Sequence, residues 1–220
     1  MGFQILYWEP VKLNWFPMKE LTENLKILEF CETYFMQNGF HKTTMDDIAK
    51  ELRISKKTIY KHFSSKDELV RAVFVRIRND LSGQIEGIVN GEGDAIIKLY
   101  NISKLFSARI ATITNKWLND LQFYLPDAWR EVEEFRVKMM QKNMTALVEQ
   151  GKSENLINDL PTAIIMGVLI SSVQGVVNPE FILHNNISLH KAGQLTLEIV
   201  FAGILSKKGR KLFKQYNLGS

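Results

Sequence analysis

The chain has 220 residues, of which 45% are hydrophobic and 24% charged, and its formal net charge at pH 7 is +4. This composition is typical of a soluble globular protein and excludes a disordered or fibrous chain. The longest apolar stretch, residues 163–170, is much shorter than the ~18 residues that a membrane-spanning helix requires. We therefore expect no membrane partner, and the single cysteine, Cys31, fits a reducing, cytoplasmic setting.

The cysteine and histidine content argues against redox and metal chemistry. Cys31 is the single cysteine, so no internal disulfide can form, and the four histidines have no metal-ligand spacing. The chain also lacks a glycine-rich phosphate loop, a G-x-S-x-G motif and an H-E-x-x-H motif. We therefore expect no enzyme, no catalytic residue, no metal and no cofactor.

Residues 1–17 carry several aromatic side chains but lack the basic start and the long apolar run of a secretory signal. They are either a misassigned start or a short arm that packs on the body of the protein, and the sequence leaves both alternatives open. We treat them as an N-terminal extension, separate from the domains that follow.

Apolar residues recur at spacings of three and four along the chain, and no alternation typical of strands is sustained, so we predict an all-α fold. The first helix has an apolar face from Ile27 to Phe35 and ends at Asn38-Gly39, a left-handed stop signal. Capping patterns between residues 44 and 68 mark the starts of three more helices. Beyond these, further helices are expected over 95–113, 115–124, 127–151, 161–178 and 188–206.

Three capping patterns mark the helices between residues 44 and 81. Thr44 and Asp47 form the capping-box pattern of a short second helix. Ser55 is placed to cap a third helix of about two turns by accepting a backbone N–H. Ser65 and Glu68 repeat the capping-box pattern at the start of a longer fourth helix.

The second and third helices are joined by the short segment 52–55, which predicts a helix-turn-helix. Its small core is expected to consist of Ile48, Ile54, Ile59 and Phe63. With Ile59 and Phe63 turned inward, the outward face of the third helix is basic, hydroxylated and aromatic: Lys57, Thr58, Tyr60 and Lys61, with His62 at the margin.

Two lysines lie where the helix dipole disfavours them. Lys56 and Lys57 fall in the first turn of the third helix, the positive end of its macrodipole. Phosphate oxygens would offset this conflict, because N–H groups at a helix N-terminus favour anions and lysines release counterions. The pattern therefore favours docking on double-stranded DNA, and the alternative is an ordinary solvated charged face.

Residues 44–69 carry a recognisable signature. They read Thr-Met-Asp-Asp-Ile-Ala-Lys-Glu-Leu-Arg-Ile-Ser-Lys-Lys-Thr-Ile-Tyr-Lys-His-Phe-Ser-Ser-Lys-Asp-Glu-Leu. This segment resembles the signature of the tetracycline-repressor (TetR) family of transcriptional regulators, and outside about 20–75 the resemblance is one of length and helicity only. One departure is Arg53, where the family pattern usually has glycine, so a non-glycine residue has to accept a left-handed conformation at a cost of ~1 kcal/mol.

The resemblance implies operator-DNA contacts from residues around the second and third helices: Thr44, Ser55, Lys57, Thr58, Tyr60 and His62. It also implies that Lys66 contacts a phosphate. Lys56 and Lys61 add positive charge to the same surface.

The resemblance further implies two helical domains: a helix-turn-helix domain over 18–66 and a dimerisation and effector domain over 67–206. We expect residues 207–220, which hold a second basic cluster, to form a solvated, fraying tail.

A homodimer is expected, because paired recognition helices match two half-sites about one DNA turn apart. Gly167, Ser171 and Gly175 recur every four residues and would let a neighbouring helix approach closely, although packing within one subunit is the alternative. The helix over 188–206 is apolar nearly all round. The candidate interface residues are Gly167, Ser171, Gly175, Leu197, Phe201 and Ile204.

A small-molecule effector would be held by the aromatic and methionine side chains of the second domain: Phe106, Trp117, Phe123, Tyr124, Trp129, Met140 and Met166. The alternative is that these residues form the core, which needs the same residue types. Effector binding would tilt the helix that begins at Lys66 and release a repressor from its operator. A second alternative is an architectural DNA-binding protein without an effector.

Overall fold

The computed structural model describes residues 18–218, which are helical apart from short connections and one isolated bridge between Ile157 and Leu205. The prediction of an all-α fold is confirmed. The helices are α1 (Met18–Asn38), α2 (Met45–Leu52), α3 (Lys56–His62), α4 (Lys66–Asn90), α5 (Ala95–Ile110), α6 (Asn115–Tyr124), α7 (Pro126–Ser153), α8 (Thr162–Val176), α9 (Pro179–Asn185), α10 (Leu189–Ile204) and α11 (Lys207–Leu218). The extension 1–17 lies outside the described residues.

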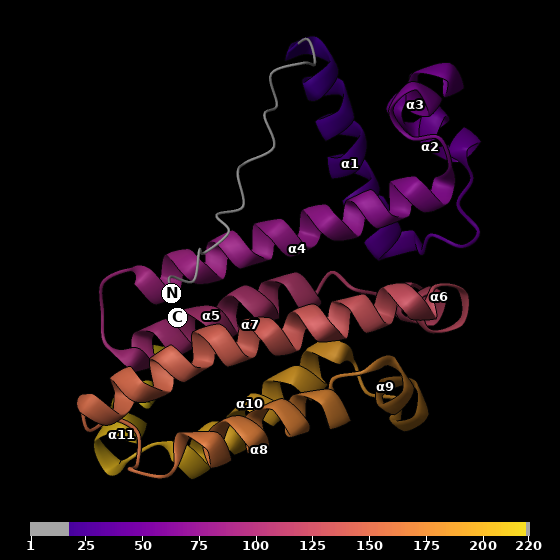
Figure 1. Ribbon diagram of the computed structural model, residues 1–220. Coiled ribbons are helices and arrows are strands. Elements are labelled where there is room, and N and C mark those ends of the chain that lie inside the picture. The colour runs from indigo at the N-terminus through magenta and orange to yellow at the C-terminus, as the bar shows by residue number, and fades with distance from the viewer. Residues whose placement is uncertain (1–17, 219–220) are drawn as a thin grey trace, which may run out of the picture.

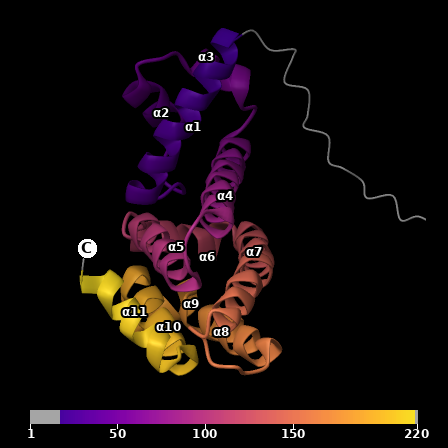
Figure 2. The same cartoon turned by 90° about the vertical axis from the view of Figure 1, so that its left-hand side faces the viewer.

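The helices form a small N-terminal group and a larger layered body (Figure 1). Helices α1, α2 and α3 gather at the N-terminal end of α4, and α4 runs on over α5 and α7. Below this layer, α8 and α10 pack side by side, and α11 packs on α5. Figure 2 shows the same division from the side, with α3 and α11 at opposite ends of the molecule. Helix α4 therefore belongs to both parts.

Local side-chain caps explain where α2 and α3 begin. The Thr44 side chain accepts a hydrogen bond from the Asp47 N–H at 3.2 Å, and the Asp47 carboxylate accepts from the Thr44 N–H at 2.9 Å. The Ser55 hydroxyl accepts from the Thr58 N–H at 3.0 Å. Each cap satisfies backbone donors that the first turn of a helix leaves unpaired, so both predicted helix starts are confirmed.

The cap of α4 differs in one bond from the expected capping box. Ser65 accepts from the Glu68 N–H at 3.1 Å, as predicted. The Glu68 carboxylate, however, accepts from the N–H and hydroxyl of Ser64 rather than from the N–H of Ser65, at 2.7 and 2.5 Å. Ser64 offers the carboxylate two donors at once, which explains the preference.

Two helices were not expected from the sequence. Asn178 and Pro179, interpreted as a stop for α8, also start α9, because the Asn178 side chain accepts from the Phe181 N–H at 2.9 Å and proline fits the first helical position. The expectation that residues 207–220 form a fraying tail is wrong for α11. Leu212 and Phe213 of α11 pack on the core, and Phe213 meets the ring of Tyr100 edge-on at 6.5 Å.

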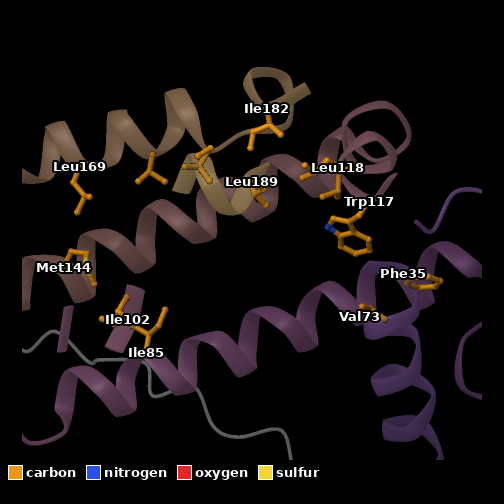
Figure 3. Close-up of a cluster of buried hydrophobic side chains, with 14 of the residues drawn as sticks. Phe35, Val73, Ile85, Ile102, Trp117, Leu118, Met144, Leu169, Ile182 and Leu189 are labelled. Atoms are coloured by element: carbon orange, nitrogen blue, oxygen red, sulfur yellow. The ribbon is translucent and has the colours of Figure 1, made fainter. Parts of the chain in front are cut away.

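One continuous hydrophobic core links the two parts of the molecule. Figure 3 shows Phe35 of α1 and Val73 of α4 near Trp117 of α6, with Met144 and Leu169 deeper in the body. None of the described helices is by itself long and apolar enough to cross a membrane; α8 and α9 reach that length and composition only as a pair bent by 57°.

Candidate nucleic-acid interface

In the turn between α2 and α3, Arg53 adopts the left-handed conformation, with φ 54° and ψ 41°. Its N–H donates to the carbonyl of Lys50 at 3.1 Å, and the next N–H, of Ile54, donates to Ala49 at 3.0 Å. These two bonds close the C-terminus of α2 and turn the chain into α3. The expected left-handed conformation of a non-glycine residue is confirmed, and it costs about 1–2 kcal/mol.

A small core fixes the angle between the two short helices. Ile48 of α2 and Ile59 of α3 are completely buried, and Phe63 at the end of α3 is nearly so. Ile54 is half-buried in the turn and packs against them. The predicted core is therefore present, and it orients the opposite side of α3 toward solvent.

We define the α3 face as Lys57, Tyr60 and Lys61, which are all exposed at the tip of the molecule. The Tyr60 side chain is 49% exposed although it is large and aromatic. Thr58 is half-buried beside this face, and its hydroxyl lies 2.9 Å from the hydroxyl of Ser55. The face thus combines two lysines and a phenol, and two hydroxyls lie beside it.

Lys56 and His62 each lie beside a carboxylate of a neighbouring helix. Lys56 forms an ion pair of 2.5 Å with Asp46 of α2, and both side chains are largely exposed, so the pair contributes little and opens easily. The His62 side chain is 8% exposed and its Nε2 lies 3.1 Å from Oε2 of Glu23 on α1. His62 therefore lies between α3 and α1 rather than on the α3 face.

Lys66 fastens the segment that leads into α2. Its Nζ donates to the carbonyls of His41 and Thr43, at 2.7 and 3.1 Å. These bonds hold the residues just before the Thr44 cap against the first turn of α4. The ammonium is half-buried, and the DNA contact that the resemblance implies for it remains a prediction.

The same segment is held from the other side by α6. Oδ2 of Asp120 accepts from the N–H groups of Phe40 and His41, at 2.6 and 2.8 Å. Gly39 has φ 77°, and a Cβ there would lie 2.5 Å from that carboxylate oxygen, so the close approach requires glycine. The ring of His41 also stacks on Tyr124, with centroids 3.4 Å apart.

Further contacts join α1 to the body. The Thr114 hydroxyl donates to the Met36 carbonyl at 2.9 Å, which ties the start of α6 to the end of α1. Glu32 of α1 accepts from Arg76 of α4 at 3.2 Å and from Arg109 of α5 at 2.9 Å. Sequence reasoning missed this junction, because its partners lie 44 to 80 residues apart and none belongs to a motif.

The candidate effector residues do not come together at one place. Trp117 is buried between the two parts of the molecule, where its ring meets Phe40 at 5.3 Å and Phe74 at 5.0 Å. Phe123 and Tyr124 are exposed. The remaining candidates lie inside or partly inside the body: Met166 is buried, and Phe106, Trp129 and Met140 are half-buried.

One polar group lies among these apolar side chains. Arg136 of α7 lies over the ring of Trp129 at 5.7 Å and donates to the carbonyl of Val177 at 2.8 Å. It contacts Glu133 as an ion pair, but its Nε has no hydrogen-bond partner and burial lowers the pKa of its guanidinium. Across the described residues, no group of three or more His, Cys, Asp or Glu side chains could hold a metal.

The candidate dimer residues divide between the surface and the interior. Gly167, Ser171 and Gly175 are exposed along one side of α8. Phe201 and Ile204 are buried within the chain and Leu197 is half-buried, so these three lie on the inner side of α10. We define the α8–α10 face as the exposed small residues of α8 together with exposed large apolar residues of the adjacent helices α8 and α10: Ile164, Gly167, Val168, Ser171, Gly175, Leu195 and Ile199.

Two short capped helices, a tight left-handed turn and a basic outer face, supported on α1 and α4, define a helix-turn-helix regulator that binds DNA. Residues 27–73 match the model of the family described as bacterial regulatory proteins, tetR family. The helix-turn-helix part of the chain therefore has the sequence of a TetR-family transcriptional regulator.

Two relatives match most of the chain. The HTH-type transcriptional regulator YvaF of Bacillus subtilis is 28% identical over 171 residues, which cover 76% of this chain and 88% of YvaF. The HTH-type transcriptional repressor KstR2 of Mycolicibacterium smegmatis is 24% identical over 203 residues, which cover 89% of this chain and 97% of KstR2.

The solved structures share the fold. A transcriptional regulator from Saccharomonospora viridis, in complex with choline, superposes with a TM-score of 0.65 at 16% sequence identity. The match covers 85% of this chain and all of the Saccharomonospora viridis chain. At this identity the likeness concerns the fold alone.

Proposed function

We propose that the protein is a homodimeric, cytoplasmic repressor that binds operator DNA through α3 and is released by a small-molecule effector. The observation that carries the proposal is the α3 face, in which two lysines and an exposed tyrosine stand at the tip of a rigid helix-turn-helix. The repressor assignment is supported by the relative KstR2, which is a transcriptional repressor.

The α3 face provides both kinds of contact that operator binding needs. Lys57 and Lys61 supply positive charge for phosphates, which gives affinity and salt dependence. Tyr60 and Thr58 supply hydroxyls and an aromatic ring for base edges or sugars. Thr44 caps α2 at the same end of the domain, and His62 and Lys66 hold α3 and the preceding segment in position.

A second copy of the chain is the occupant that we propose for the α8–α10 face. The side chain of Ile199 is 73% exposed and that of Ile164 is 62% exposed, which is unfavourable for a monomer in water. A Cβ at Gly167 or Gly175 would meet nothing within 4 Å, so the small residues leave room for a neighbouring helix. Two protomers joined here would present two α3 helices to two half-sites.

Signal transfer from an effector is proposed to run through α6. This helix packs on α7 and α9 in the body, and its Asp120 holds the segment before α2 through two hydrogen bonds. A ligand that shifts α6 or α7 would therefore move the helix-turn-helix relative to α4. Arg136 beside Trp129 is a polar anchor for such a ligand, and the choline bound to the Saccharomonospora viridis regulator supports a small-molecule effector.

Fluorescence anisotropy with DNA from upstream of the protein's own gene, over a salt series, tests operator binding. The variant Lys57→Ala/Tyr60→Ala is expected to lose at least about 100-fold in affinity and to reduce the salt slope by about 1. The matched control Lys138→Ala/Phe123→Ala removes an exposed lysine and an exposed aromatic elsewhere and should bind like the wild type. Tight binding that is indifferent to sequence would instead support an architectural DNA-binding protein.

A further inference from the structure

The last helix holds a concentration of positive charge that operator binding does not use. Five bases fall within residues 207–214, and no acidic residue follows Glu198. Since the whole chain has a net charge of +4, the residues outside these five sum to −1. All five bases of α11 are exposed: Lys207, Lys208, Arg210, Lys211 and Lys214.

The orientation of α11 is fixed by its inner side. Leu212, Phe213 and Tyr216 pack on the core, and the Tyr216 hydroxyl donates to Asp94 at 3.0 Å. At the start of the helix, the Ser206 N–H donates to the Leu156 carbonyl at 3.0 Å. The bases therefore stand on a rigid surface rather than on a mobile tail.

A glycine allows this close docking. A Cβ at Gly209 would lie 2.0 Å from the carbonyl oxygen of Leu156, so no other residue fits without moving the helix. The Gly209 N–H donates to the Ser206 hydroxyl at 3.0 Å, which caps the first turn. The helix is thus seated against the segment after α7 with its basic side turned out.

Four of the bases form one surface. Lys207, Arg210, Lys211 and Lys214 line a single shallow hollow, as their spacing of three and four along α11 allows. Within residues 18–218, none of these four side chains forms an ion pair. We call this surface the α11 face. Its charge is unbalanced by the protein itself and is available to an external anion.

We propose that the α11 face binds the phosphate backbone of a second DNA duplex, without sequence preference, while α3 holds the operator. The α3 and α11 helices lie at opposite ends of the molecule, so a short duplex bound at α3 does not pass the α11 face (Figures 1 and 2). Four cations on one helical face match a polyphosphate backbone, where each contact releases counterions.

An anionic membrane is the less favoured ligand. A helix that lies on a membrane buries an apolar face among the lipids. In α11 the apolar residues Leu212, Phe213 and Tyr216 already pack on the core, so over residues 207–216 the outward side has only polar and charged groups to offer. Purely electrostatic contact favours the denser charge of duplex DNA.

The test uses the full chain, and each variant replaces three lysines. Lys207→Gln/Lys211→Gln/Lys214→Gln removes charge from the α11 face, and Lys116→Gln/Lys138→Gln/Lys191→Gln removes the same charge from exposed sites elsewhere. Both are made in the Lys57→Ala/Tyr60→Ala background, so that α3 no longer dominates. Binding of a short non-operator duplex is followed by anisotropy over a salt series.

We expect the α11 substitutions to weaken this binding by at least about tenfold at low salt and to reduce the salt slope by about 2–3. The control triple should change affinity by much less, and replacing the three α11 lysines by arginine should preserve it. Equal losses in the two glutamine triples would overturn the proposal in favour of bulk charge. Binding to phosphatidylserine vesicles but not to the duplex would overturn it in favour of a lipid surface.

A capture assay separates this proposal from operator binding. Operator DNA on beads, loaded with protein whose α3 is intact, should retain a second, labelled non-operator duplex, and the α11 substitutions should abolish that retention. The amount of protein that stays on the operator beads reports on α3 in the same tube. Normal operator binding without capture of the second duplex would refute the α11 proposal and leave the proposed repressor function intact.

Discussion

The α3 face and the α8–α10 face are both exposed, but they differ in chemistry. The α3 face presents lysines and a tyrosine on a helix whose caps are completed by residues within three positions. The α8–α10 face presents isoleucine, valine and glycine on helices held by the large core. Water solvates the first surface well and the second poorly. The first therefore suits reversible binding of a polyanion, and the second suits a lasting contact with another copy of the chain.

The largest expected effect comes from placing a charge on the α8–α10 face. If two copies join through this face, as we propose, Ile199→Glu should yield a monomer, because a buried carboxylate at the interface would lack a partner. Operator affinity should then fall by about 100-fold or more, since only one half-site is bound. Light scattering after size-exclusion chromatography measures the mass. Phe123→Glu, at an equally exposed apolar site on α6, should leave the protein dimeric.

A matched pair of glycine substitutions tests the junction between the two parts. Gly39→Ala should lower the free energy of unfolding by at least about 1–2 kcal/mol, because alanine disfavours φ 77° and its Cβ would displace the Asp120 carboxylate. Gly87→Ala in α4, where a Cβ meets nothing within 4 Å, should raise it by about 0.5–1 kcal/mol. Urea unfolding of both variants gives the comparison. Equal stabilities would contradict the role assigned to Gly39.

Arg53 offers a smaller test of the α2–α3 turn. Arg53→Gly should raise the free energy of unfolding by about 1 kcal/mol at most, because glycine accepts the left-handed conformation without strain but adds freedom to the unfolded chain. The thermal midpoint reports this gain. A loss of operator affinity in the stabilised variant would identify Arg53 as a phosphate contact, and unchanged affinity would limit it to the turn.

The smallest effect concerns acid stability of the N-terminal caps. Hydrogen bonds from the Thr44 hydroxyl and N–H lower the pKa of Asp47, and those from the Ser64 hydroxyl and N–H lower the pKa of Glu68. Because both carboxyl pKa values are lower in the folded state, their stabilisation is present above the unfolded values near about 4 and is lost as the pH falls through the folded values. Unfolding midpoints of Asp47→Asn/Glu68→Gln over this range should fall less steeply with acid than those of the wild type.

The helix-turn-helix can be predicted from local sequence alone. Its caps, turn and small core depend on residues close together in the chain, such as Thr44 with Asp47 and Ile48 with Ile59, so a local pattern is sufficient to predict them. The family signature lies in the same stretch and adds the expected DNA contacts, of which Lys57 and Tyr60 are exposed together on α3.

Which side of each later helix is exposed depends instead on how the helices pack in three dimensions. Helix α10 is apolar nearly all round, so its sequence could not distinguish the inward Phe201 from the outward Ile199. Packing against α5 and α8, and the contact of the Phe201 ring with Phe213 of α11, make that choice. In the same way, the bond from Asp120 to the Phe40 N–H and the turning of His62 toward Glu23 join residues that are distant in the chain. Such contacts are set by how the helices pack together, and helical periodicity contains no information about them.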